Sequence, residues 1–195
     1  MGGEITIKTG TTPGTPSAGN ITLWADADGT LQALQSSGSS SGLGMYSAYM
    51  KCSDVKAQDA QGGTFTQDAW QTREINTEDA DTGGNMSISS NQITLDAGTY
   101  RCLITCPAVR VNRHQARLYD ITGSAVLLLG TQGSTQAAGA DGQDNSLITG
   151  RFTLSVESAL EIQHICSATA VTLGFGFQSS WTSGVFTVAE FWKEA

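Results

Sequence analysis

Residues 151–166 read RFTLSVESALEIQHIC, and this stretch decides the fold class. Apolar side chains alternate with polar ones in two successive runs, first at Phe152, Leu154 and Val156 and then at Leu160, Ile162 and His164. A period of two sends successive side chains to opposite faces of a β-strand. The stretch therefore predicts two strands, each of which buries one face.

The same kind of pattern continues through the chain from residue 45 onward. Gly, Asn, Asp and Ser separate short apolar runs at intervals of about 8–12 residues, which is typical of a sandwich or jelly roll. A content of 23 Gly in 195 residues also argues against a helical bundle. We expect an all-β jelly-roll β-sandwich, with strands over residues 45–51, 65–75, 85–88, 92–95, 99–106, 114–121, 125–129, 147–156, 159–166, 172–178 and 185–192.

The first 34 residues have a different composition. They contain two of the three prolines, Pro13 and Pro16, in a segment that favours extended backbone. Two apolar runs then flank Asp28-Gly29, a pair typical of a tight hairpin turn. Because a lone hairpin is marginally stable in water, its apolar side chains need a partner surface. We predict an extended segment and hairpin that anchor the chain on another protein through Ile21, Leu23, Trp24, Leu31 and Leu34.

Residues 35–44 contain five Ser and three Gly, which is the composition of a flexible linker. We therefore divide the chain into an anchor over residues 1–34, a linker over residues 35–44 and a jelly-roll head over residues 45–195.

The charge balance limits the choice of partner. Lys and Arg total 10 against 18 Asp and Glu, a formal net charge of −8. Nucleic acids and anionic membranes attract basic proteins, so we expect neither as a partner. The sequence also has no apolar run of about 18 residues, and its first residues do not resemble a signal peptide. We expect a protein made in a cytoplasm and not inserted in a membrane.

The residue types that carry chemistry do not form a recognisable active site. Cys52, Cys102, Cys106 and Cys166 are expected to be reduced thiols. His164 and Cys166 share a strand face, so a zinc site is an alternative to satisfied core polar groups, but the spacing of zinc ligands is absent. Asp26-Ala-Asp28-Gly29 begins like a calcium loop and lacks its distal ligands. We predict no metal and no cofactor.

Catalytic motifs are missing as well. The sequence contains neither a Gly-x-Ser-x-Gly nucleophile turn nor a phosphate-binding loop. The carboxylates at residues 74–81 are compatible with a glycosidase pair, but a solvated acidic loop explains them better. We predict that the protein is not an enzyme and has no catalytic residues.

The positive charge is concentrated in one part of the chain. Arg101, Arg110, Arg113, Arg117 and Arg151 are half of the Lys and Arg residues. Arg113 and Arg117 are expected on one strand face, where guanidinium groups suit an anionic sugar or phosphate. The alternative is pairing with carboxylates across a subunit interface.

The last predicted strand, residues 185–192, is apolar on both faces. Phe186, Val188 and Trp192 are expected on one side, and we predict that they form a subunit interface. The alternative is cover by a loop of the same domain. The polar loop over residues 131–144 is a second candidate recognition surface.

A family resemblance rests on several motifs in a fixed order. They are Gly63-Thr64-Phe65 through Trp70, Asp81-Thr-Gly-Gly-Asn85, Leu95-Asp-Ala-Gly98-Thr-Tyr100-Arg101, Arg113-His114-Gln-Ala-Arg117-Leu118, Gly150-Arg151-Phe152 and Glu190-Phe-Trp-Lys-Glu194. With them, residues 45–195 resemble the C-terminal jelly-roll domain of tailed-bacteriophage structural proteins. That domain is similar in architecture to the heads of complement and tumour necrosis factor proteins.

The first 34 residues resemble the short hairpin near the start of many phage fibre and virion proteins. The resemblance implies a homotrimer displayed on a virion, a short spike or fibre knob that contacts other virion proteins through its N-terminal segment. Host-surface polysaccharide is a further candidate partner that the resemblance suggests. The alternatives are a capsid decoration or head-fibre protein without a receptor role, a soluble lectin-like ligand, and a glycan depolymerase. The missing signal peptide argues against the soluble ligand, and the missing catalytic motifs argue against the depolymerase.

Overall fold

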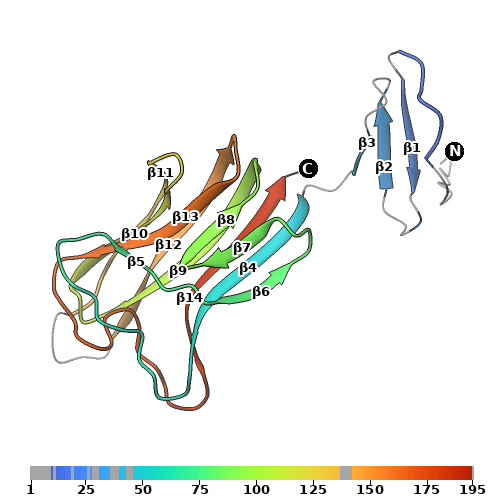
Figure 1. The fold of residues 1–195 in the computed structure, drawn as a ribbon. Coiled ribbons are helices and arrows are strands. Elements are labelled where there is room, and N and C mark those ends of the chain that lie inside the picture. Colours follow the sequence, from blue (N-terminus) through green and yellow to red (C-terminus); the bar gives the residue numbers. More distant parts are fainter. Residues whose placement is uncertain are drawn as a thin grey trace, which may run out of the picture. The chain divides into compact units, whose positions relative to one another are not determined.

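A computed structural model describes residues 10, 12–18, 20–25, 27, 31–35, 40–42, 46–136 and 142–194. None of these residues lies in a helix, so the predicted all-β class is confirmed. The chain divides into two compact units, with the boundary between Ser47 and Ala48 (Figure 1). The Asp28-Gly29 turn lies outside the described residues.

The N-terminal unit is a small antiparallel sheet. Strand β1 (Ile21–Ala25) pairs with β2 (Leu31–Gln35), so that Leu23 stands opposite Ala33, as expected for a hairpin. Strand β3 (Ser40–Gly42) then pairs with the other edge of β2. Part of the segment predicted to be a flexible linker is therefore a strand. Strand pairing uses backbone groups, so Ser and Gly can complete an open edge although their side chains add little.

The second unit is a jelly-roll β-sandwich of two sheets (Figure 1). One, the β10 sheet, has the order β11-β10-β13-β8-β7, with β5 paired to β13. Its strands are β5 (Gln71–Thr72), β7 (Met86–Ser89), β8 (Gln92–Leu95), β10 (Arg113–Asp120), β11 (Ala125–Ser134) and β13 (Ser158–Cys166). The other, the β9 sheet, has the order β12-β9-β14-β4-β6. Its strands are β4 (Tyr46–Lys56), β6 (Thr77–Asp81), β9 (Gly98–Val109), β12 (Gln143–Leu154) and β14 (Gly184–Glu194).

The core lies between the two sheets and follows the alternation in the sequence. Phe152 and Leu154 of β12 and Leu160 and Ile162 of β13 are all buried in one apolar cluster, as predicted. Val156 is 56% exposed, because β12 has already ended at Leu154.

Two predicted strands are largely loops. Residues 172–178 form no strand, and of residues 65–75 only β5 and an isolated bridge at Phe65 pair. Residues 62–65 instead lie against residues 170–176: Gly62 donates a backbone bond of 3.0 Å to the carbonyl of Gly176, and Gly63 forms an isolated bridge with Leu173. A Cβ at Gly62 would come within 2.6 Å of the Gly176 nitrogen, and Gly176 itself has φ +142°. The glycines therefore permit a close backbone approach.

These loops gather at one end of the sandwich, which we call the loop pole. It comprises residues 57–70, 110–112 and 167–183 and the described ends of the β11–β12 connection. Backbone bonds join Val109 to Gly174, Ala168 to Val111 and Thr135 to Asn112. Strand β4 ends at this pole, so the chain enters the sandwich at the opposite end.

Candidate functional site

The five predicted anchor residues divide into two groups. Trp24 and Leu34 are buried, with exposed fractions of 9% and 3%. Ile21, Leu23 and Leu31 are exposed, as expected for a hairpin that cannot bury its own apolar side chains. Their role as an anchor stays a prediction.

The outer face of the β9 sheet carries an apolar strip, which consists of Tyr49, Leu103, Leu147, Val188 and Trp192. One charged side chain interrupts the strip: Glu190 lies on the same face of β14 and stands opposite Leu103 in the register. Burial, followed by the Glu190 charge, raises the pKa of Tyr49. In the strand register Leu147 and Val188 both stand opposite Thr105 of the central strand β9. The Trp192 ring lies 5.6 Å from the Tyr49 ring, centroid to centroid. Leu103 and Leu147 remain 42% and 40% exposed. Four adjacent strands thus present apolar groups on a face that the core does not use.

Phe186 is separated from the other two residues predicted for the interface. It is buried at the loop pole, where its ring packs against Gly176 and Gly184. Phe186 and Thr187 are both buried in succession, so the alternation of β14 is interrupted there. Val188 and Trp192 lie on the outer face, whereas Ala189 and Phe191 point into the core.

At one end of the strip, charged side chains form ion pairs with one another within the chain. Arg151 donates bonds of 2.9 and 2.7 Å to the Glu194 carboxylate, and Arg101 lies 3.4 Å from the same group. Bonds from Arg151, followed by those from Arg101, hold the pKa of Glu194 below its usual value. Two of the five clustered arginines thus share one carboxylate within the chain.

Arg113 and Arg117 lie on the outer face of the β10 sheet, as predicted. The Arg117 guanidinium stacks 4.0 Å from the Trp70 centroid and 4.9 Å from that of Tyr119, and its Nε bonds to Gln163. Exposed Arg113 lines a cavity of about 350 Å³. The two side chains have different surroundings, so they do not form one ready-made anion site. Their contact with an anionic ligand stays a prediction.

His114 and His164 form a buried pair in the β10 sheet. His114 Nδ1 and His164 Nε2 are 3.0 Å apart. The second nitrogen of each ring has no hydrogen-bond partner among the described residues, although Asp144 Oδ2 lies 3.7 Å from His114 Nε2. Burial lowers the pKa of both rings, and the Arg73 charge lowers that of His164 further. Both rings are therefore neutral at pH 7.

The four cysteines are free and buried. Burial raises the pKa of Cys52 and Cys102 to about 12 and that of Cys106 and Cys166 to about 11. Within the described part of the chain, no group of three or more His, Cys, Asp or Glu side chains is placed to hold a metal ion.

A buried polar cluster near the loop pole has no counterpart in the sequence expectations. Arg73 is 1% exposed, and its guanidinium donates bonds to Thr187 Oγ1 at 2.7 Å, Pro107 O at 3.0 Å and Phe175 O at 2.9 Å. Burial lowers the pKa of Arg73 to about 10, so the side chain is still charged at neutral pH. Through these hydrogen bonds Arg73 links the end of β9 at Pro107, the start of β14 at Thr187 and the loop that contains Phe175.

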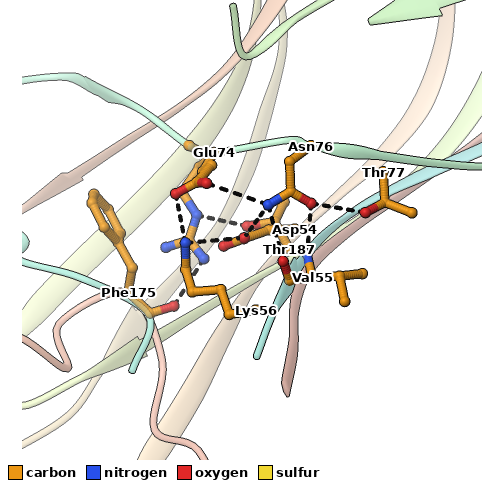
Figure 2. Close-up of polar contacts among 9 residues, drawn as sticks. Asp54, Val55, Lys56, Glu74, Asn76, Thr77, Phe175 and Thr187 are labelled. Carbon is orange, nitrogen blue, oxygen red and sulfur yellow. Dashed lines mark hydrogen bonds and ion pairs between the residues drawn. The ribbon is translucent and has the colours of Figure 1, made fainter. Parts of the chain in front are cut away.

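Lys56 extends this cluster toward the surface. Its Nζ lies 3.2 Å from Asp54 Oδ1 and 2.5 Å from Glu74 Oε2. Figure 2 shows Lys56 together with Asp54 and Glu74. The Asn76 side chain makes two hydrogen bonds with the backbone of Val55: its Oδ1 accepts from the Val55 N–H, and its Nδ2 donates to the Val55 carbonyl. Burial raises the pKa of Asp54, and the Lys56 charge opposes that rise. The acidic segment expected to be a solvated loop is instead tied to β4, partly as strand β6.

Comparison with known proteins is informative only at the level of the fold. No family model matches the sequence, and no curated protein sequence matches it significantly. No helix among the described residues is long and apolar enough to span a membrane.

Solved structures do match. A structure of Eiger TNF from S. frugiperda has a TM-score of 0.51 and 10% identity, covering 75% of this chain and 93% of that one. Murine APRIL at pH 8.5 has a TM-score of 0.50 and 10% identity, covering 75% and 98%. The PRD1 vertex protein P5 has a TM-score of 0.48 and 13% identity, covering 78% and 100%. The second unit of this chain is therefore a jelly roll of the tumour necrosis factor type.

Proposed function

We propose that this chain is a structural protein of a tailed-phage or phage-like particle, in which three jelly rolls associate into a short spike or knob. The observation that carries the proposal is the apolar strip on the outer face of the β9 sheet. The sequence resemblance of both parts of the chain to virion proteins supports the particle assignment.

Among the residues that the structure describes, none covers Leu103 and Leu147 of the strip, which remain exposed. Leu103, Leu147 and Val188 project from adjacent strands. Exposing such apolar side chains to water is unfavourable, and burying them in an interface stabilises the assembly. Cyclic association hides the same face on every copy and leaves no open end. The Arg151–Glu194 pair lies at the edge, where charges are tolerated at little cost.

The N-terminal unit supplies the attachment to the particle. Its exposed Ile21, Leu23 and Leu31 form a second apolar surface, separate in the chain from the strip. Two such surfaces suit a protein that binds its own copies through one and another virion protein through the other.

Mass photometry of the whole 195-residue chain tests the trimer. We expect a mass three times 20.4 kDa. Leu103→Asp should yield monomers, because burying an unpaired carboxylate in an interface costs several kcal/mol. Leu129→Asp is the matched control, since Leu129 is 60% exposed on the outer face of the other sheet. A monomeric wild type, or trimers of Leu103→Asp, would reject the interface.

Peptide mass spectrometry of purified particles tests the assignment to a virion. Particles from the strain that carries the gene should contain the chain in multiples of three. A variant lacking residues 1–34 should still form trimers and be absent from the particles. Particles with a normal content of this variant would contradict the anchor.

A further inference from the structure

Trp181 is the most exposed large hydrophobic side chain among the described residues. Its exposed fraction is 87%, and within the described part of the chain it has no ring contact. A Trp side chain that projects into water buries little apolar area within its own chain, so most of its ring surface stays accessible to a ligand. The Trp181 ring is therefore accessible to a binding partner, and the structure of its loop indicates which kind.

The loop that carries Trp181 is fixed by hydrogen bonds of the Gln178 side chain. This side chain is 4% exposed, and its amide donates to Thr182 O at 2.7 Å and to Ala57 O at 3.3 Å. Its carbonyl oxygen accepts bonds from the backbone of Asp59 and Ser180. One buried amide thus fixes the backbone on both sides of Trp181.

A second loop strengthens this support. Gln58 donates from its side chain to Ser180 O at 2.9 Å, and Gln61 accepts from the backbone nitrogen of Gln178 at 2.9 Å. The Trp181 backbone is therefore ordered before any ligand arrives, which lowers the entropy cost of binding.

The polar groups around Trp181 indicate the class of ligand. Residues 179–183 read SSWTS, so residues with hydroxyl side chains precede and follow Trp181 in the chain, and Gln58 of the supporting loop bonds to the backbone of Ser180. The apolar C–H face of a pyranose packs on an aromatic ring, while its hydroxyls bond to amide and hydroxyl groups. A rigid aromatic group with adaptable polar neighbours is also a common composition of binding surfaces.

Charge argues for a neutral sugar. The only charged side chain in the segments that support the loop is Asp59, and the chain has a net charge of −8. Both disfavour acidic sugars and the phosphates of nucleic acids.

The topology places this group at the loop pole, away from the end at which the chain enters the sandwich. We propose that Trp181 is the stacking platform of a binding site for neutral hexose oligosaccharides. This inference deepens the proposed function by adding a ligand, and it does not depend on the apolar strip.

Isothermal titration of the full-length chain tests the site, with neutral hexasaccharides of glucose, of galactose and of mannose as probes and a hexasaccharide of galacturonic acid as the acidic control. We expect at least one neutral probe to bind, and the acidic one to bind more weakly. Trp181→Ala should weaken binding at least about tenfold, as for a central aromatic contact. Val171→Ala, at a 69% exposed residue of the same β13–β14 connection, should change nothing.

Two further measurements separate this site from the alternatives. Gln178→Ala keeps the indole and should weaken binding about threefold by loosening the loop. Mass photometry should find the same oligomer for wild type and Trp181→Ala. The proposal is overturned if no neutral probe binds, if Trp181→Ala binds as wild type does, or if Trp181→Ala changes the oligomer, which would identify a second copy as its occupant. None of these outcomes alters the test of Leu103→Asp.

Discussion

The interior of the jelly roll has two regions of different chemistry. Its middle is apolar, with residues such as Ile104, Ile148 and Phe191 fully buried between the sheets. Near the loop pole the interior contains Arg73 and the His114–His164 pair. Within the sheets, backbone groups pair with neighbouring strands, so apolar side chains suffice.

At the loop pole the strands end and carbonyl groups lose those partners. Arg73 bonds to the carbonyls of Pro107 and Phe175, and Gln178 bonds to those of Ala57 and Thr182. Buried polar side chains therefore appear where the backbone needs donors. This difference predicts that the two regions respond differently to substitution and to pH.

The largest effect is expected from Arg73→Met. The substitution leaves two carbonyls and the Thr187 hydroxyl without a partner, so the free energy of unfolding should fall by about 3–5 kcal/mol. Urea denaturation followed by tryptophan fluorescence measures the loss. An unchanged unfolding midpoint would show that the polar region does not depend on this side chain.

An effect of at most similar size is expected from lowering the pH from 7.5 to 5. Burial holds the pKa of both histidines below the ordinary value of 6.5, so the unfolded chain binds protons there that the folded chain does not. The contribution of the neutral histidines to the free energy of unfolding is fully present above pH 6.5. As the pH falls below 6.5, the free energy of unfolding should decrease by up to about 1.4 kcal/mol per pH unit for each histidine. Asp144, which faces His114, moderates the loss.

Urea midpoints at several pH values measure this loss. Lowered carboxylate pKa values, such as those of Glu74 and Asp81, act only at more acidic pH. A stability that is flat between pH 7.5 and 5 would contradict the neutral histidine pair.

The smallest effect is expected in the apolar middle. Ile104→Val removes one methylene group from a fully buried site and should cost about 0.5–1.5 kcal/mol. Because no titratable group is removed, the loss should be the same at pH 7.5 and pH 5. A loss as large as that of Arg73→Met would remove the proposed contrast between the two regions.

Much of the sheet structure could be predicted from the sequence. Alternation identified β12 and β13, and the Gly, Asn and Asp between apolar runs located most of the turns. Strand β6 was missed because Thr77–Asp81 is acidic and carries no apolar alternation, and its pairing with β4 depends on backbone groups. Residues 172–178 alternate like a strand, but their glycines serve a close approach to the loop at Gly62.

The candidate sites were predicted less completely. Val188 and Trp192 were correctly placed on one strand face, because alternation is a local property. Phe186 was grouped with them, although the interruption at Thr187 sends it into the interior. The Trp181 platform was not found, since its support comes from Gln58 and Gln61, more than 110 residues earlier in the chain.

By itself, then, the sequence determined the all-β class, the alternating strands, the apolar hairpin and the acidic character, all of which depend on neighbouring residues or on composition. Only the tertiary structure decided that Arg73 is buried, that the two histidines meet and that Trp181 projects from a rigid loop. These features depend on groups brought together from distant strands, and local patterns carry no information about which carbonyl or ring will face which side chain.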